Sequence, residues 1–590
     1  MDPLEQASLL GIEVDYVDAR GKPRQVTPQV IARIAEALRA AAPGAPAVVD
    51  IAAAPREAFQ GPPGRWWLLA TQLYGVRSRR NWGHGDFADL FALVELAAAL
   101  GAGGIGLNPL HALFEEDLGQ PSPYSPNSRL FLNPLYIAVE EVPDFVDRPP
   151  AIADEVARLR DAELVDHAGV VRLKQQCLRA AFRAFAAHAP PERRDDFEVF
   201  RRSRAPTLER FACFEVLRAR LGSPWWQWPD EWHDPSPAAL ARLRAEAGDE
   251  ISYREYVQWI ADRQLMRCRD RARALALPVG LYLDIAVGVR PDGFDAWDRP
   301  DALIRTLAVG APPDMLNTAG QNWGLAGFSG VGLEARAFGP YRDMLRAAMH
   351  YAGAIRLDHV LGLKRLYLIP DGMPPDQGAY VRLPFDQMLA MTADESIHNR
   401  CIVIGEDLGT VPEGFRAKLA QWGIWSYLVM LFERNAAGAF HRPSRYREQA
   451  LATFSTHDLP SFAGWIGKRD LHVKKGLGLD PGETARERTN AVSQLRRLLG
   501  VRTIQQVDFP SVFRCLAASP ARMLVVALED VLGVEDQVNV PGTIGQHPNW
   551  RRKLPCELEG LQHDERLHAI GRIAAAASRS AAPALRPVNP

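Results

Sequence analysis

The chain has 590 residues, of which 47% are hydrophobic and 24% charged, an ordinary composition for a globular protein that can bury a large core. Its 69 Lys and Arg nearly balance its 71 Asp and Glu, which gives a formal charge of −2. Nucleic acids and anionic membranes are bound through an excess of positive charge. The composition therefore argues against both as the main partner and favours a neutral or weakly charged substrate.

The six cysteines lie far apart in the sequence and form no CxxC pair. Such spacing is typical of reduced thiols in a cytoplasmic protein and predicts neither a disulfide framework nor a zinc site. The polar, acidic N-terminus lacks the apolar segment of a secretory signal. The longest apolar run, residues 91–107, is interrupted by Glu95 and by several glycines, so we expect no membrane span and a cytoplasmic location.

Residues 1–60 are predicted to form a mainly helical extension, with an amphipathic helix at 28–41 and an Ala/Pro-rich linker at 40–55. From Trp66 onward, short apolar runs of strand length alternate with segments of helical periodicity. Strands that are apolar on both faces are typical of a parallel sheet covered by helices. The eight predicted strands are residues 66–70, 105–107, 279–284, 354–358, 402–405, 425–430, 451–455 and 523–528.

Eight strand–helix units predict an α/β fold in which residues 61–577 form a closed (β/α)₈ TIM barrel. The pattern alone leaves an open, doubly wound sheet as the alternative. Residues 110–278, between the second and third strands, carry long helical patterns and are too many for a structureless loop, so they predict a helical insertion subdomain. Residues 578–590 are rich in Ala, Ser, Arg and Pro and predict a disordered tail.

Two sequence features resemble cofactor or metal motifs, but their context does not support that function. Residues 101–106 have GxGxxG spacing, yet they follow a predicted helix and precede a strand, so no helix N-terminus is available for a pyrophosphate. A helix C-cap is the better interpretation. The dipeptides Asp358-His359 and His457-Asp458 place adjacent side chains on opposite faces of a strand, where they rarely bind one metal ion. We expect no cofactor and no metal.

Three acidic residues, Asp358, Glu406 and Asp458, lie at the ends of predicted barrel strands. The carboxyl ends of barrel strands line the active-site mouth, so these side chains are expected to meet there. Each alone could be a solvated residue or a helix N-cap. Together they suit cleavage at an acetal carbon, which needs a carboxylate nucleophile and a protonated carboxyl group. Arg356 shares a strand face with Asp358, where it would keep Asp358 ionised or form a structural salt bridge.

The three carboxylates occur in the motifs RLDH at 356–359, GEDLG at 405–409 and STHD at 455–458. Further motifs are SPYSPNSR at 122–129, GAPPD at 310–314, GQNWG at 320–324 and QVNVPGT at 537–543. In this order and at these strand ends, they resemble the motifs of the 4-alpha-glucanotransferases of the α-amylase clan, also called amylomaltases or disproportionating enzymes. The resemblance extends from about residue 65 to 555, nearly the whole predicted barrel.

This resemblance implies transfer of α-1,4-glucan segments between maltooligosaccharides or glucan polymers by a retaining double displacement. Asp358 would attack the anomeric carbon, Glu406 would act first as acid and then as base, and Asp458 would hold the sugar in its distorted transition state. We expect a raised pKa for Glu406, because it must be protonated in the first step. The family's remaining substrate-binding positions would be Arg356, His457, Tyr124, Asp292, Gln321, Trp323, Glu433 and Asn539.

The resemblance also implies a flexible loop insertion at 310–338 that covers the acceptor groove. An aromatic-lined acceptor site excludes water and favours transfer over hydrolysis, with Trp323, Tyr124 and Trp465 as sugar platforms. Too little sequence follows the eighth strand for the C-terminal β-sandwich of ordinary amylases, which favours the glucanotransferases. The alternatives are an α-1,4-glucan hydrolase of the same clan and a non-catalytic glucan-binding protein on the same fold.

Overall fold

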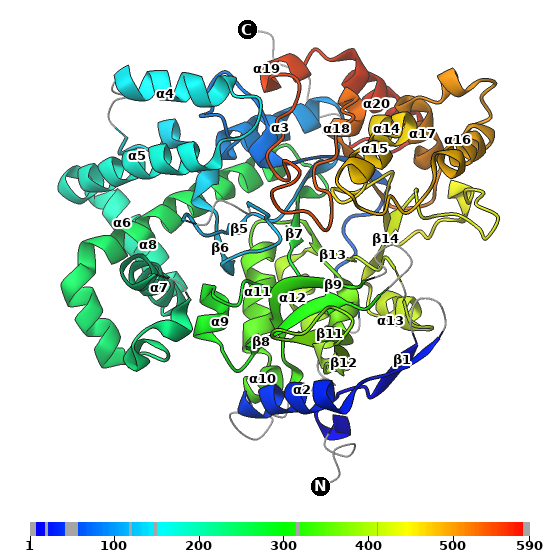
Figure 1. Cartoon of the computed structure of the whole chain (residues 1–590). Coiled ribbons are helices and arrows are strands. Elements are labelled where there is room, and N and C mark those ends of the chain that lie inside the picture. Colours follow the sequence, from blue (N-terminus) through cyan, green and yellow to red (C-terminus); the bar gives the residue numbers. More distant parts are fainter. Residues whose placement is uncertain are drawn as a thin grey trace.

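The computed structural model describes the chain except for residues 1–6, 18–21, 42–56, 117–120, 146–149, 223, 314–318, 410 and 582–590. Eight parallel strands close into a barrel, which confirms the TIM barrel over the open sheet (Figure 1). Every predicted strand is present, with bounds that differ by at most two residues. In barrel order they are β3 (Trp66–Thr71), β4 (Gly104–Leu107), β7 (Gly280–Ile285), β10 (Ala354–Leu357), β13 (Ile402–Gly405), β14 (Trp425–Val429), β15 (Ala450–Thr453) and β16 (Met523–Ala527).

Helices enclose the barrel and bury its strands on both faces. Every residue of β7, β10, β13 and β14 is buried, because one face fills the barrel and the other packs against helices. The helices on the chain from β3 onward, outside the insertion, are α3 (Phe87–Ala99), α9 (Phe294–Asp298), α10 (Gly330–Ala335), α11 (Gly339–Met349), α12 (Phe385–Asn399), α13 (Phe415–Gln421), α14 (Phe462–Gly467), α15 (Arg469–Gly476), α16 (Ala485–Leu499), α17 (Phe509–Ala517), α18 (Leu528–Leu532), α19 (Leu558–Leu561) and α20 (Glu565–Ala576).

The expectation that a helix follows every barrel strand is wrong between β14 and β15. Residues 430–449, all of them described, contain only a short 3₁₀ turn at Pro443–Arg445. The segment includes Asn435, Gly438 and Pro443, which favour turns, and it lacks a continuous apolar stripe. The barrel rim is therefore formed by irregular chain at this point.

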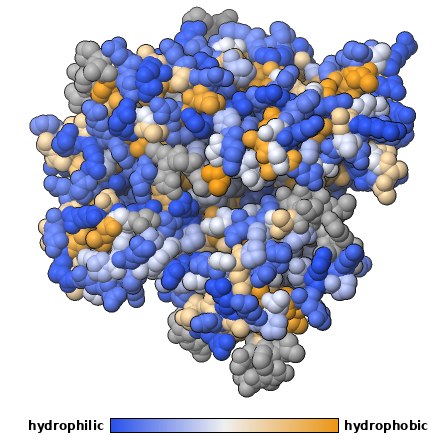
Figure 2. Space-filling model, viewed as in Figure 1, coloured by the Kyte–Doolittle hydropathy of each residue, from blue (hydrophilic) through white to orange (hydrophobic). Residues whose placement is uncertain are grey.

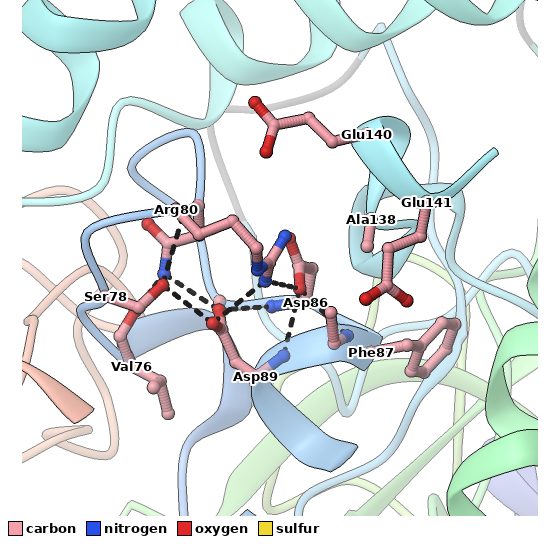
Figure 3. Close-up of polar contacts among 12 residues, drawn as sticks. Val76, Ser78, Arg80, Asp86, Phe87, Asp89, Ala138, Glu140 and Glu141 are labelled. Carbon is pink, nitrogen blue, oxygen red and sulfur yellow. Dashed lines mark hydrogen bonds and ion pairs between the residues drawn. The ribbon is translucent and has the colours of Figure 1, made fainter. Parts of the chain in front are cut away.

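Helix α3 begins and ends at signals that the sequence carries. Asp86 caps its N-terminus, and the Asp86 and Asp89 carboxylates both bind Arg80, as Figure 3 shows. At the other end Gly101 has φ +72°, and Ala102 donates a backbone hydrogen bond to Ala97, so residues 101–106 begin as the predicted C-cap.

The chain between β4 and β7 is largely helical. A short hairpin of β5 (His111–Ala112) and β6 (Ser128–Leu132) precedes α4 (Pro150–Asp161), α5 (His167–His188), α6 (Pro191–Arg204), α7 (Thr207–Leu221) and α8 (Pro237–Ala274). Helix α8 has a kink at Ala247 and packs against α3, α7 and β7, which joins these helices to the barrel wall (Figure 1).

A four-stranded antiparallel sheet, which the sequence pattern did not predict, lies outside the barrel. Its strand order is β12 (Ala379–Arg382), β11 (Arg365–Pro370), β8 (Leu303–Ala311), β9 (Gln321–Phe328). The segment 310–338, expected to be a loop, contains β9 and α10 on one side of the undescribed residues 314–318. Helix α2 (Pro28–Ala40) packs beneath this sheet on β8 and β11 (Figure 1).

The termini differ in part from the expected pattern. The N-terminal extension contains, besides α2, a small hairpin of β1 (Asp15–Val17) and β2 (Pro23–Gln25), and most of the predicted linker lies outside the described residues. The prediction of a disordered tail is wrong for residues 578–581. Arg579 is fully buried, and its guanidinium donates to the carbonyls of Ala517 and Ala521, an interaction that composition cannot reveal. Residues 582–590 lie outside the described part.

The surface drawn in Figure 2 is mostly hydrophilic, with hydrophobic residues in separate patches. Across the described residues, every helix is too short or too polar to span a membrane. One continuous hydrophobic core joins the barrel, the helices between β4 and β7, and α2.

Candidate active site

Asp358 and Glu406 lie side by side at one end of the barrel. They directly follow β10 and β13, which are paired in parallel with Leu357 opposite Gly405. The backbone N–H of Glu406 donates to the carbonyl of Leu357 at 3.0 Å. Both carboxylates therefore reach the C-terminal mouth of the barrel at the same depth.

Arg356 holds the nucleophile candidate on one side and a further carboxylate on the other. Its guanidinium lies 2.8 Å from Asp358 and 2.7 Å from Asp284, the latter in β7. Both Arg356 and Asp284 are buried. Burial strengthens such charge pairing, and Arg356 and Asp358 meet as expected from the strand face that they share.

Asp284 is a site residue that the sequence analysis missed. Its carboxylate accepts a hydrogen bond of 2.6 Å from the Tyr124 hydroxyl, and that hydroxyl also lies 3.2 Å from Nδ1 of His457. The Tyr124 and His457 rings are stacked at 4.5 Å. Asp284 is near the end of a predicted barrel strand, so the criterion that identified Asp358 could have identified it.

Replacing Tyr124 with Phe should lower kcat/KM for maltotriose about tenfold. The variant keeps the ring that stacks on His457, so the protein should fold, but it leaves buried Asp284 without its hydroxyl donor. Steady-state kinetics test this expectation. Unchanged kinetics in the folded variant would contradict a role for this hydroxyl in the site.

Asp458 follows β15 in the chain and lies beside His457 and Asn539. Its carboxylate lies 3.3 Å from the His457 ring and accepts a hydrogen bond of 2.6 Å from the Asn539 amide. Burial acts to raise the pKa of Asp458, but His457 and Asn539 outweigh it and hold the pKa below its usual range. The half-exposed Asp458 carboxylate is therefore an ionised hydrogen-bond acceptor facing the mouth.

Glu406 has a raised pKa, which confirms the expectation from its acid role. The pKa of Glu406 is raised to about 7, because burial and Asp358 raise it by more than Arg356 and the backbone hydrogen bonds lower it. Its two carboxyl oxygens accept backbone hydrogen bonds of 2.9 Å from His359 and 2.8 Å from Leu408. The site thus contains one carboxylate paired with Arg356 and one carboxyl group with a raised pKa.

Trp550 is a second residue that the sequence did not reveal. It has φ +58°, and its ring lies 5.5 Å from Tyr124 and 5.4 Å from His457. The His167 side chain at the start of α5 donates to the Trp550 carbonyl at 2.9 Å. A cavity of about 100 Å³ is lined in part by Asp284, Arg356 and His457.

The profile of the 4-alpha-glucanotransferase family matches residues 71–559. The chain belongs to this family. Among its relatives, the 4-alpha-glucanotransferase of Haemophilus influenzae is 34% identical over 555 residues, covering 87% of this chain and 79% of the relative. That of Mycobacterium tuberculosis is 35% identical over 552 residues, covering 88% and 76%. As a member of this family, the chain is an enzyme that transfers segments of α-1,4-glucans.

Solved structures agree with the fold. The amylomaltase of Corynebacterium glutamicum has 25% sequence identity and a TM-score of 0.83, with 97% of this chain and 99% of that chain covered. The amylomaltase of Streptococcus agalactiae, solved in complex with acarbose, has 19% identity and a TM-score of 0.74 over 88% of this chain and 100% of that chain.

Trp323 and Gln321 lie on the hairpin of β8 and β9. The half-buried Trp323 ring lies edge-on to the ring of His359, the residue after Asp358, at 5.3 Å. Its indole N–H donates to the Gln321 side chain at 3.3 Å. The hairpin thus meets the barrel mouth through Trp323.

Asp292 and Glu433 lie in other surroundings. Asp292 pairs with Arg290 at 3.0 Å and with Arg218 at 3.3 Å, in the segment between β7 and α9. Glu433 lies between β14 and β15, where burial raises its pKa and nearby His441 lowers it. None of these contacts involves Asp358, Glu406 or Asp458.

Trp465 is not a sugar platform. Its side chain is 2% exposed and packs against Phe440 and Phe454. Within the described part of the chain, no group of three or more His, Cys, Asp or Glu side chains is arranged to hold a metal ion.

Proposed function

We propose that the transfer proceeds by a retaining double displacement with Asp358 as nucleophile and Glu406 as acid and base. A carboxylate oxygen of Asp358 forms a bond to the anomeric carbon while the bond to the glycosidic oxygen breaks, and Glu406 gives its proton to that oxygen. In the second step a sugar hydroxyl attacks the anomeric carbon, Glu406 takes its proton, and Asp358 leaves as a carboxylate. The configuration is inverted twice and so retained.

The observation that carries this proposal is the difference between the two neighbouring carboxyl groups. Asp358 forms an ion pair with Arg356 at 2.8 Å. Glu406 has no such contact at hydrogen-bond distance, and burial raises its pKa to about 7. Paired carboxyl groups whose surroundings separate their proton affinities are typical of glycosidic acid–nucleophile pairs.

Asp458, Arg356 and His457 would bind the donor sugar at the anomeric end. The ionised Asp458 carboxylate is suited to accept bonds from two sugar hydroxyls and to stabilise positive charge on an oxocarbenium-like ring. Tyr124 and Asn539 contact this group directly and would orient it. These contacts support a donor subsite built from the ends of β7, β10 and β15.

Transfer rather than hydrolysis requires a sugar, not water, to reach the glycosyl-enzyme. Trp323 on the β8–β9 hairpin packs against His359, the residue after Asp358, and bonds to Gln321, which supports Trp323 and Gln321 as the acceptor side. Asp292 and Glu433 would bind glucan units farther from the cleavage point. The substrates would be maltooligosaccharides and α-1,4-glucan polymers.

We further propose that residues 61–577 are the catalytic barrel, with 110–278 as an inserted helical subdomain and 1–60 as a separate extension. The packing of α2 beneath β8 and β11 supports a role for the extension in supporting the hairpin. A cytoplasmic location is proposed from the absence of paired cysteines in the sequence.

Incubation with maltotriose tests the proposed function. The expected products are glucose and a ladder of longer maltooligosaccharides, without a net increase in reducing ends, because each bond broken is replaced by a bond formed. Chromatography resolved by size and a reducing-end assay measure both quantities. A steady rise in reducing ends with no longer products would favour the hydrolase, and the absence of any product would favour the non-catalytic alternative.

A further inference from the structure

His359 has an unusual backbone for its position. It follows Asp358 and has φ +48° and ψ +60°, the left-handed region that residues with a Cβ atom rarely occupy. Glycine would give the same turn without steric cost. A strained histidine beside a reacting carboxylate therefore suggests that both its backbone and its ring have a function.

The backbone of His359 and of the residue after it binds the acid. This N–H donates to Oε2 of Glu406 at 2.9 Å, while Leu408 donates to Oε1 at 2.8 Å. The next residue, Val360, donates to the Glu406 backbone carbonyl at 2.9 Å. The His359–Val360 turn thus places two successive backbone donors on Glu406, one on its carboxyl group and one on its main-chain carbonyl, and the left-handed φ and ψ of His359 set the angle between these two donors.

The ring of His359 connects the same residue to the β8–β9 hairpin. The Trp323 and His359 rings meet edge-on at 5.3 Å with an interplanar angle of 81°. His359 is half-buried, and burial lowers the pKa of its ring, so the ring is neutral at pH 7. The contact is therefore one of packing and not of charge.

We propose that His359 is a positioning residue that links Trp323 of the β8–β9 hairpin to the orientation of Glu406. When a sugar packs against Trp323, the ring contact holds His359 in its left-handed conformation, and the His359 N–H holds the Glu406 carboxyl group toward the glycosidic oxygen. The acid is then fully aligned only when the acceptor side is occupied. This inference rests on the proposed acid role of Glu406.

Two donors that differ in the leaving group separate positioning of the acid from a general structural role. Maltotriose has a poor leaving group that needs a proton, whereas the fluoride of α-maltosyl fluoride leaves without one. The first turnover of each donor is measured, as glucose or maltose release and as fluoride release. A variant that misplaces the acid slows the first donor and spares the second.

His359→Gly and His359→Ala form a matched pair. Both remove the ring, but only glycine adopts the left-handed backbone freely. With maltotriose, we expect His359→Ala to be about 5- to 30-fold slower than His359→Gly, the range set by the cost of this conformation. With α-maltosyl fluoride the two should agree within about twofold. Equal rates for both variants with maltotriose, or an equal loss with both donors, would overturn the proposal.

Arg400 provides the control for backbone strain. It also has positive φ, +51°, but it lies between α12 and β13, at the opposite end of the barrel from Glu406. Arg400→Ala and Arg400→Gly should differ in thermal stability and not in the ratio of rates with the two donors. A change in that ratio would show that strain anywhere has this effect and would overturn the specific role of His359.

A double-mutant cycle tests the link to the hairpin. Trp323→Ala should slow the maltotriose first turnover at least threefold more in the wild-type background than in His359→Gly, because the ring contact is already lost in the latter. Strictly additive effects would overturn the link. Glu406→Gln is the reference: if it slows both donors equally, the acid role itself fails, whatever the His359 variants show.

Discussion

Replacing Asp358 with Asn should reduce transfer from maltotriose about 10⁴-fold or more. The amide is a poor nucleophile, so the covalent intermediate cannot form, and loss of a catalytic nucleophile is typically of this size. The fold should persist, since Arg356 keeps its ion pair with Asp284 at 2.7 Å. Product release measured over hours, with circular dichroism as the folding check, tests this prediction.

Asp301 offers a matched control for the loss of a buried carboxylate. It is 8% exposed and pairs with Arg336 at 2.5 Å, remote in sequence from the three site carboxylates. Asp301→Asn should lower the melting temperature and leave transfer per folded molecule unchanged. If Asp358→Asn retained more than about 1% of wild-type transfer, Asp358 would not be the nucleophile.

Replacing Glu406 with Gln should reduce transfer about 10²- to 10⁴-fold and remove the basic limb of the pH profile. Burial raises the pKa of Glu406 to about 7, so the wild-type rate should fall above about pH 7 as the acid loses its proton. The variant has no proton to lose at this position. Initial rates between pH 5 and pH 9 test the prediction, and a basic limb that is unchanged in Glu406→Gln would contradict the acid role.

The same pKa shift affects stability, with a defined sign. The folded pKa of about 7 exceeds the ordinary value of 4.5, so the free energy of unfolding falls as pH rises from about 4.5 to about 7, by at most about 3 kcal/mol. Glu406→Gln should remove this pH-dependent loss of stability. The melting temperature of the variant relative to that of the wild type should therefore be higher at pH 8 than at pH 4. Glu215→Gln is the control: burial also raises the pKa of Glu215 to about 7, but it lies in α7, so only stability should change.

The barrel could be predicted because its strands depend on a local signal. β13, for example, is an unbroken apolar run, Ile402–Gly405, which can only be satisfied by burial on both faces. The same signal places Asp358 and Glu406 at strand ends. Asp284 was within reach of this reasoning, because it is the last residue of the predicted strand 279–284 just as Asp358 is the last residue of 354–358.

Other features depend on tertiary contacts that no local pattern records. The antiparallel sheet of β8, β9, β11 and β12 combines strands from two separate connections of the barrel. In β8, Arg305 and Thr306 interrupt the apolar sequence, so this strand does not have the pattern of a buried run. Trp550 reaches Tyr124 only through an irregular loop. Arg579 is buried because it satisfies backbone carbonyls around Ser519, although its segment has the composition of a disordered tail.

The central claim is that Asp358 forms a covalent bond with the donor sugar, and direct observation of that bond is the sharpest test. The Glu406→Gln variant should accept α-maltosyl fluoride, which needs no acid, and then accumulate the glycosyl-enzyme, because the second step lacks its base. Peptide mass spectrometry after acid quenching should find a maltosyl adduct on the peptide that contains Asp358. An adduct on Asp458 or Asp284 instead, or rapid fluoride release with no adduct and a product of inverted configuration, would contradict the account.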